Sequence, residues 1–159
     1  MKMYNQIVME IKVKSRLLII DSEKFDREMM NCIFGKTYSI KLTKDVHVAA
    51  RMMESFDPSV VFYELRDNDI SQINKLFAVM GKISPDAAVI ISVSDNTREL
   101  EKLIRSKNVF YYMLRPFNLK ELWDAVESGS LHFEKIRLLK NLNDVSLHKK
   151  RGVMAKNRK

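Results

Sequence analysis

Residues 16–34, RLLIIDSEKFDREMMNCIF, decide the fold. They open with an almost unbroken apolar run of five residues, and after the polar DSE the apolar residues recur at helical spacing from Phe25 to Phe34. An apolar run of this length is typical of a strand that is buried on both faces of a parallel sheet. The stretch therefore predicts a strand, a short turn and a helix, with Asp21 or Ser22 as the N-terminal cap of that helix.

Four further apolar runs follow at intervals of about 25 residues, separated by stretches with helical spacing. The runs are YSIKL (38–42), SVVFYEL (59–65), AAVIIS (87–92) and VFYYML (109–114), and the helical stretches are 46–56, 70–80 and 100–104. Strands that alternate with helices predict right-handed crossovers and a parallel sheet covered on both faces. The predicted fold class is therefore α/β, a single doubly wound (βα)5 sheet, although periodicity alone does not determine the order of its strands.

The last helix is expected to begin near Leu119 with Asn118 as its cap. Beyond residue 130 the apolar residues form a heptad-like stripe, made by Leu131, Leu138, Leu142 and Val145. A glycine costs only about 1 kcal/mol inside a helix, so Gly129 does not prevent one helix from running from 118 to about 145. Such a helix would extend beyond the domain and is predicted to pair with another copy or a partner. The alternative is a break at Gly129 and a second helix that folds back.

The positive charge is concentrated at the C-terminus. The chain has 28 Lys and Arg against 20 Asp and Glu, but its last fourteen residues hold six basic residues and no acid, so the rest has a balance of 22 to 20, or +2. We divide the chain into an N-terminal extension (1–14), a sheet domain (15–128), a helical extension (129–145) and a basic tail (146–159). The tail is predicted to be disordered, and the alternative is a segment that binds nucleic acid or an anionic membrane surface.

The sequence also argues against several classes of protein. No apolar run approaches the about 18–20 residues that span a bilayer, and residues 1–16 have no signal-peptide core, so a cytoplasmic location is predicted. The single Cys32 cannot make an internal disulfide and is expected to be a small core residue. The four glycines form no phosphate-binding loop and no histidine follows a strand, so we expect neither enzymatic activity nor a resident cofactor.

In a parallel sheet of this kind the functional crevice lies beyond the carboxyl ends of the strands. Four stretches reach that edge: Asp21–Glu23, Glu64–Arg66, Ser92–Ser94 and Arg115–Pro116.

These stretches, with the runs before them, resemble the receiver domains of bacterial two-component response regulators, the CheY-like family. RLLIIDSE is similar to the family's first strand and acidic pair, and PSVVFYELRDND is similar to its third strand and phospho-accepting aspartate. AVIIS is similar to the fourth strand, which ends at the switch Ser or Thr. YYMLRPFNLKEL is similar to the fifth strand and the Lys-Pro that follows it. The resemblance covers about residues 15–128. It implies the flavodoxin-like strand order 2-1-3-4-5 and a role in phosphorelay signal transduction.

Three positions depart from the family pattern. Glu64 stands at the phosphoacceptor position, Ser22 replaces one acid of the pair, and Arg115, followed by Pro116, replaces the lysine. Glu64 is longer than aspartate by a carbon, about 1.5 Å, and a guanidinium is not equivalent to a compact ammonium. The resemblance therefore indicates an atypical or pseudo-receiver, in which Glu64 supplies a standing negative charge and forms a bidentate pair with Arg115.

Other parts of the implied pocket are retained in kind. Asp21 retains one carboxylate of the family's acidic pair, and Glu23 could partly substitute for the carboxylate that Ser22 lacks. Ser92 retains the hydroxyl of the switch Ser or Thr, and Tyr112 retains the switch aromatic ring.

A magnesium ion is expected only if the pocket is still competent. Its weak candidate ligands are Asp21, Glu64 and the backbone carbonyl of Arg66, and Ser22 removes an oxygen anion from a site whose cation favours carboxylates in octahedral geometry.

The expected function is that of a signalling module which acts by protein–protein contact. The resemblance implies a partner face formed by about residues 97–107, 109–114 and 119–126, and the extended last helix would form a homodimer or hold a partner. One alternative is non-specific nucleic-acid binding through the basic tail on a receiver-fold platform. Another is a working response regulator that tolerates its unusual residues.

Overall fold

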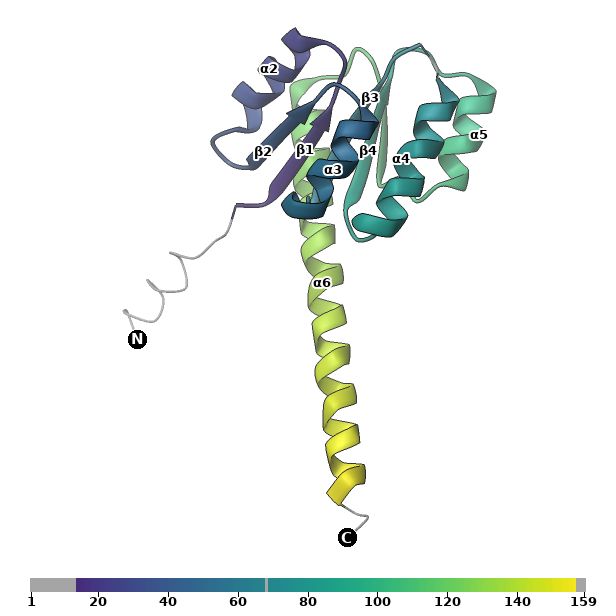
Figure 1. The fold of residues 1–159 in the computed structure, drawn as a ribbon. Coiled ribbons are helices and arrows are strands. Elements are labelled where there is room, and N and C mark those ends of the chain that lie inside the picture. Colours follow the sequence, from purple (N-terminus) through teal and green to yellow (C-terminus); the bar gives the residue numbers. More distant parts are fainter. Residues whose placement is uncertain (1–13, 68, 157–159) are drawn as a thin grey trace.

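The computed structural model describes residues 14–67 and 69–156 of the 159 residues, and within this part five strands alternate with five helices (Figure 1). In chain order the elements are β1 (Arg16–Ile20), α2 (Lys24–Phe34), β2 (Ser39–Thr43), α3 (Val46–Phe56), β3 (Val60–Leu65), α4 (Ile70–Ile83), β4 (Ala88–Val93), α5 (Arg98–Ser106), β5 (Tyr111–Leu114) and α6 (Leu119–Lys156). All neighbouring strands are parallel, in the order β2-β1-β3-β4-β5. The predicted α/β class and strand order are confirmed.

The two faces of the sheet carry separate apolar cores. Side chains that alternate along the central strands pack on one face against α3, α4 and α5. Those of opposite parity pack on the other face against α2 and α6, as Figure 1 shows. β3 and β4 are buried along their whole length, which explains why their sequences are almost continuously apolar.

Side chains cap the starts of α3, α5 and α6, and the predicted cap of the last helix, Asn118, is confirmed. Asp45 accepts from the backbone N–H of Val48, Thr97 from that of Leu100 and Asn118 from that of Glu121. The prediction for the first helix is wrong, because α2 begins after Glu23 and no side chain caps it.

The predicted burial of Cys32 in the core is also wrong. Cys32 is exposed, since Met30 and Phe34 are the members of α2 that pack on the sheet.

α6 is one continuous helix, so the alternative break at Gly129 is wrong. A Cβ atom on Gly129 would lie 3.0 Å from Cβ of Ala88 and 3.3 Å from Cγ2 of Val60. The glycine therefore lets the helix lie close against the sheet, and this packing offsets its poor helix propensity.

The C-terminal end differs from the expected disordered tail, because residues 146–156 continue α6 and its strong helix formers, such as Leu147 and Ala155, favour this. Neither boundary proposed at 128 or at 145 coincides with the end of an element.

Residues 1–13 of the N-terminal extension, and residues 157–159, lie outside the described part. None of the helices within 14–67 and 69–156 is long and apolar enough to cross a membrane.

Candidate functional site

The alternation of side chains brings the predicted pocket residues to one corner of the sheet. Ser92 pairs in register with Glu64, and Asp21 follows Ile20, which pairs with Tyr63. These three side chains continue the rows that face α2 and α6, and Arg115 has the same parity as the buried Met113 of β5. The crevice predicted from the sequence is therefore assembled on the α2–α6 side of the carboxyl edge.

The side chain of Arg66 turns back into this crevice and pairs with Asp21. Its Nε and Nη2 atoms lie 3.2 and 3.1 Å from Oδ1 of Asp21, and Nη2 lies 3.4 Å from Oδ2. The Asp21 carboxylate, only 2% exposed, also accepts from the backbone N–H of Glu23 at 2.9 Å. The sequence pointed only to the backbone carbonyl of Arg66, whereas the structure shows its guanidinium bonded to the buried carboxylate of Asp21.

Asp26 links the two arginines of the pocket and was missed by sequence reasoning. Its Oδ2 accepts from Nη2 of Arg66 at 2.6 Å and from Nη2 of Arg115 at 2.8 Å. The hydrogen bond from Arg115, together with that from Arg66, holds the pKa of Asp26 below its usual range despite partial burial. The available signal was the position of Asp26 in the first turn of α2, directly after the strand that ends at the crevice.

Glu64 is buried and only loosely paired. Its side chain is fully buried, and Oε1 lies 3.2 Å from Nε of Arg115. Within residues 14–67 and 69–156, neither carboxylate oxygen of Glu64 nor Oγ of Ser92 makes a hydrogen bond of good geometry. The predicted bidentate pair is therefore wrong, because the terminal Nη2 of Arg115 is directed to Asp26 instead.

Burial also changes the charge expected of Glu64. It raises the pKa of Glu64 to about 7, while the Ser92 hydroxyl and the charge of Arg115 lower that pKa only in part. Burial therefore favours the protonated, neutral form of Glu64 more than in an exposed glutamate. The standing negative charge at this position stays a prediction, and the burial of Glu64 argues against it.

Ser22 and Glu23 lie at the rim of the pocket, and both are exposed. With Arg66 they help to line an open depression of about 410 Å³. Glu23 contributes its backbone N–H to Asp21, and within the described residues its carboxylate makes no hydrogen bond or ion pair.

The two remaining predicted residues lie to either side of the pocket. Tyr112 packs against the core on the α3–α5 face, and its hydroxyl lies 2.9 Å from Oδ1 of Asn96. Pro116 follows Arg115 through a cis peptide bond and is exposed.

The residues present do not fit a magnesium ion. Of the candidate ligands, the Asp21 carboxylate is already paired with Arg66, and the Glu64 carboxylate is buried beside Arg115. In the described part of the chain no three Asp, Glu, His or Cys residues are arranged to hold a metal. The positive charge of the pocket is supplied by arginine side chains.

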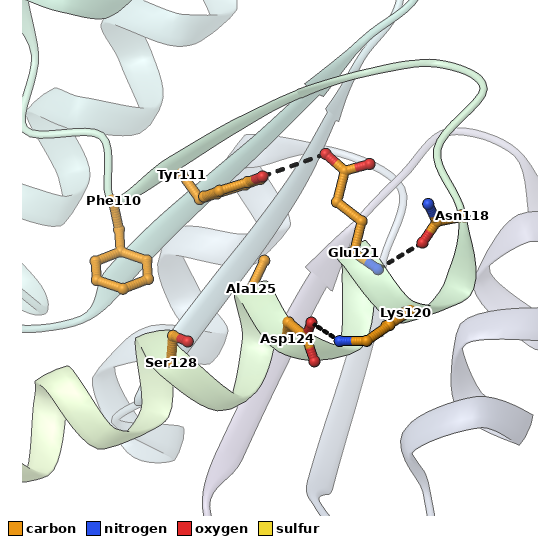
Figure 2. Close-up of a pocket in the computed structure, with 8 residues that line it drawn as sticks. All are labelled: Phe110, Tyr111, Asn118, Lys120, Glu121, Asp124, Ala125 and Ser128. Carbon is orange, nitrogen blue, oxygen red and sulfur yellow. Dashed lines mark hydrogen bonds and ion pairs between the residues drawn. The ribbon is translucent and has the colours of Figure 1, made fainter.

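A separate groove lies between the edge strand β5 and α6, and Figure 2 shows its lining. It has a volume of about 430 Å³ and includes Phe110, Tyr111 and Ala125. Polar pairs cross its rim: the Tyr111 hydroxyl lies 3.3 Å from Oε1 of Glu121, and Lys120 pairs with Asp124 along α6. This groove falls within the predicted partner face.

Comparison with known proteins shows similarity at the level of structure. No protein-family model and no curated protein matches the sequence. A CheY-like response regulator receiver domain protein from Methanospirillum hungatei superposes with a TM-score of 0.69 and 15% identity, covering 77% of this chain and 98% of that one. The chemotaxis protein CheY4 of Vibrio cholerae gives 0.65 and 14%, covering 73% and 98%. A structure described as adenylate cyclase from Rhodopirellula baltica gives 0.74 and 13%, covering 83% and 98%. The chain therefore has the fold of the CheY-like response regulator receiver domains.

Proposed function

We propose that this protein is a signalling module of the pseudo-receiver kind, which acts by protein–protein contact and does not depend on phosphorylation at the standard position. The observation that carries the proposal is the pairing of Arg66 with Asp21, at the position where a receiver of the ordinary kind is expected to need a cation. A guanidinium bonded to a buried carboxylate is held in place by the fold and requires no ion from solution.

The surroundings of Glu64 support the same proposal. An acyl phosphate forms only when a carboxylate oxygen is free to attack a phosphorus atom in line, with its charge intact. Glu64 is fully buried beside Arg115, and its burial raises its pKa, which favours the neutral form. Its side chain is therefore poorly placed and poorly charged for that attack.

The surface proposed to contact a partner is formed by α5, β5 and the first two turns of α6. It exposes three large apolar residues, Tyr111 (39%), Leu114 (46%) and Leu119 (60%), around the β5–α6 groove. β5 is an edge strand, so backbone groups on its outer side are also available to a partner. A protein with one fixed state would be controlled by the concentration of its partner rather than by a shift between two conformations.

The experiment is to incubate the intact chain with acetyl phosphate and Mg²⁺ and to map any modified residue by mass spectrometry. The expected result is an unmodified chain. A phosphoryl group on Glu64, or on Asp21, Asp26 or Asp67 in the same crevice, would contradict the proposal and would favour a working response regulator.

A second candidate is non-specific nucleic-acid binding through the basic tail. It is supported by α6, which carries residues 146–156 away from the domain at the end opposite the crevice (Figure 1). Binding to random duplex DNA that disappears on removal of 146–159, and that weakens steeply with salt, would favour this function. No binding at low salt would contradict it.

A further inference from the structure

We propose that α6 pairs with α6 of a second copy of this chain in a parallel, in-register coiled coil, through an apolar surface made by Leu131, Leu138, Leu142 and Val145. We call these four residues the α6 stripe. It lies C-terminal to the proposed partner face and on the far side of the molecule from the crevice. The inference therefore does not rest on the proposed function.

The α6 stripe is exposed although its members are large and apolar. Leu131, Leu138, Leu142 and Val145 are 61, 59, 57 and 55% exposed. The earlier part of the same helix behaves differently, because Leu122 and Val126 are fully buried against the sheet. A soluble domain rarely leaves a continuous apolar row unpaired along a helix.

The α6 stripe is directed away from the domain. Phe133 is buried against the domain and Arg137 packs over its ring at 4.8 Å, so these two residues mark the side of α6 that faces the domain. At about 100° per residue, the centre of the stripe lies roughly 130° around the helix from that side. A second helix can lie along the stripe from Leu138 to Val145 clear of the domain, whereas at Leu131 it would pass beside Ser15 and Tyr38, which line a depression with Leu131.

Ion pairs hold α6 at a fixed angle where it leaves the domain. Arg137 lies 3.0 Å from Oδ1 of Asp57 and 3.1 Å from Oδ2 of Asp86, and Lys140 lies 2.5 Å from Oδ1 of Asp86. Asp57 also pairs with Arg16 of β1 at 2.9 Å. The stripe therefore lies on a helix whose first half is fixed to the domain. This lowers the conformational entropy that the helix loses when it pairs with a second copy.

The spacing of the stripe suits a second copy of the same helix. Leu131, Leu138 and Val145 follow one another at intervals of seven residues and take the d position of a heptad. Leu142 then takes an a position, and Lys135 takes the a position before it. A stripe that repeats in this way is complementary to itself about a two-fold axis.

Lys135 lies in the seam, and a parallel partner offers it an opposite charge. In a parallel, in-register pair, a side chain at a inserts between four residues of the facing helix, one of which is the preceding g residue. That residue is Glu134 of the second copy, and both Lys135 and Glu134 are exposed in the single chain. Lys135 of each copy therefore meets Glu134 of the other, and this contact opposes the repulsion between the two Lys135 side chains, which share one layer of the seam.

The size of the seam predicts a reversible dimer. The stripe spans about 21 Å of helix at 1.5 Å per residue, or about two heptads. At about 100 Å² for each apolar side chain, the eight stripe residues of two copies bury roughly 800 Å². Permanent interfaces are larger, so the dimer is expected to dissociate on dilution.

The test is sedimentation velocity on the full chain between 1 and 200 µM. The wild-type mass should rise from that of an 18.6 kDa monomer toward twice that value.

The double variant Leu138→Gln/Leu142→Gln should associate at least tenfold more weakly than the wild type. Its helix content, measured by circular dichroism, should be unchanged because both side chains are exposed. The matched control is Leu147→Gln, which is equally exposed at 57% but lies on the opposite side of α6. It should associate like the wild type.

The orientation is tested by oxidative cross-linking in a Cys32→Ser background, which removes the exposed native thiol. Leu138→Cys should form a disulfide-linked dimer, because equal d positions meet only in a parallel, in-register pair, and Leu147→Cys should not. A monomeric wild type at 200 µM, or equal cross-linking of the two variants, would overturn the proposal. Association that appears only after removal of residues 1–13 would also overturn it, since that segment would then cover the stripe.

Discussion

Replacing Arg66 with alanine should destabilise the fold and give the pocket an affinity for Mg²⁺ that the wild type lacks. Asp21 is 2% exposed and the Arg66 side chain 26% exposed, so water screens their contact only in part. In the variant, the Asp21 carboxylate keeps one hydrogen bond, from the backbone N–H of Glu23, and loses its counter-charge. Leaving a buried carboxylate without its charged partner costs about 3 kcal/mol.

Magnesium should return part of that stability to the variant alone. Without the Arg66 guanidinium, the Asp21 carboxylate is free to face a cation, while Asp26 beside it keeps its pair with Arg115. If the variant binds Mg²⁺ with a dissociation constant on the order of 1 mM, then 10 mM Mg²⁺ adds about 1.4 kcal/mol to its free energy of unfolding. In the wild type the position is taken by Arg66, so Mg²⁺ should leave the unfolding curve unchanged.

The assay is urea unfolding followed by circular dichroism, in EDTA and in 10 mM Mg²⁺. Arg105→Ala is the matched control, because Arg105 pairs with Glu101 at the exposed surface of α5 and its loss should cost under about 1 kcal/mol with no response to Mg²⁺. A wild type that Mg²⁺ stabilises as much as the Arg66→Ala variant would show that Arg66 does not occupy the cation position. A loss below about 1 kcal/mol in Arg66→Ala without Mg²⁺ would refute the expected cost of leaving Asp21 unpaired.

Two further predictions concern Glu64 and the glycines. Because burial raises the pKa of Glu64 to about 7 from 4.5, the folded state binds its proton more tightly than the unfolded state does, and the free energy of unfolding should fall by up to about 3 kcal/mol between pH 5 and pH 8. Glu64→Gln should lack that part of the slope in urea unfolding at the two pH values, and parallel profiles would contradict the assignment. Gly129→Ala should destabilise the fold by about 1–2 kcal/mol, since its Cβ would lie 3.0 Å from Ala88. Gly81→Ala, in an exposed position of α4 with no atom within 4 Å of the new Cβ, should stabilise it by about 0.5–1 kcal/mol, and equal effects of the two in thermal unfolding would contradict this packing.

The architecture was predictable because it depends on periodicity, which is local. Nearly continuous apolar runs marked β3 and β4, and polar residues after each strand marked the crevice, so Asp21, Glu64, Ser92 and Arg115 were expected at one edge. The strand order came from the resemblance to receiver domains. The position of Cys32 was wrong because several apolar residues surround it in α2, and spacing alone did not show which of them face the sheet.

The hydrogen bonds and ion pairs between the pocket residues could not be predicted from the periodicity of the sequence. Whether Arg66 points outward or back over Asp21 depends on the backbone after β3, where Asp67 has a positive φ of 59°. Asp26 and Arg115 are 89 residues apart in sequence and meet only because α2 and β5 lie on the same side of the crevice. The protonation of Glu64 depends on its burial, which the sequence does not state. The sequence thus indicated which residues lie at the crevice, but not which of them form hydrogen bonds or ion pairs with one another.

The most direct test of the central claim, that arginine closes this pocket to a cation and a phosphoryl group, is an amide NMR titration of the intact chain with Mg²⁺ and beryllium fluoride, a mimic of a phosphoryl group. The amide signals of Asp21, Glu64, Arg66 and Ser92 should stay in place up to high millimolar concentrations of both. Saturable shifts centred on these residues would contradict the claim.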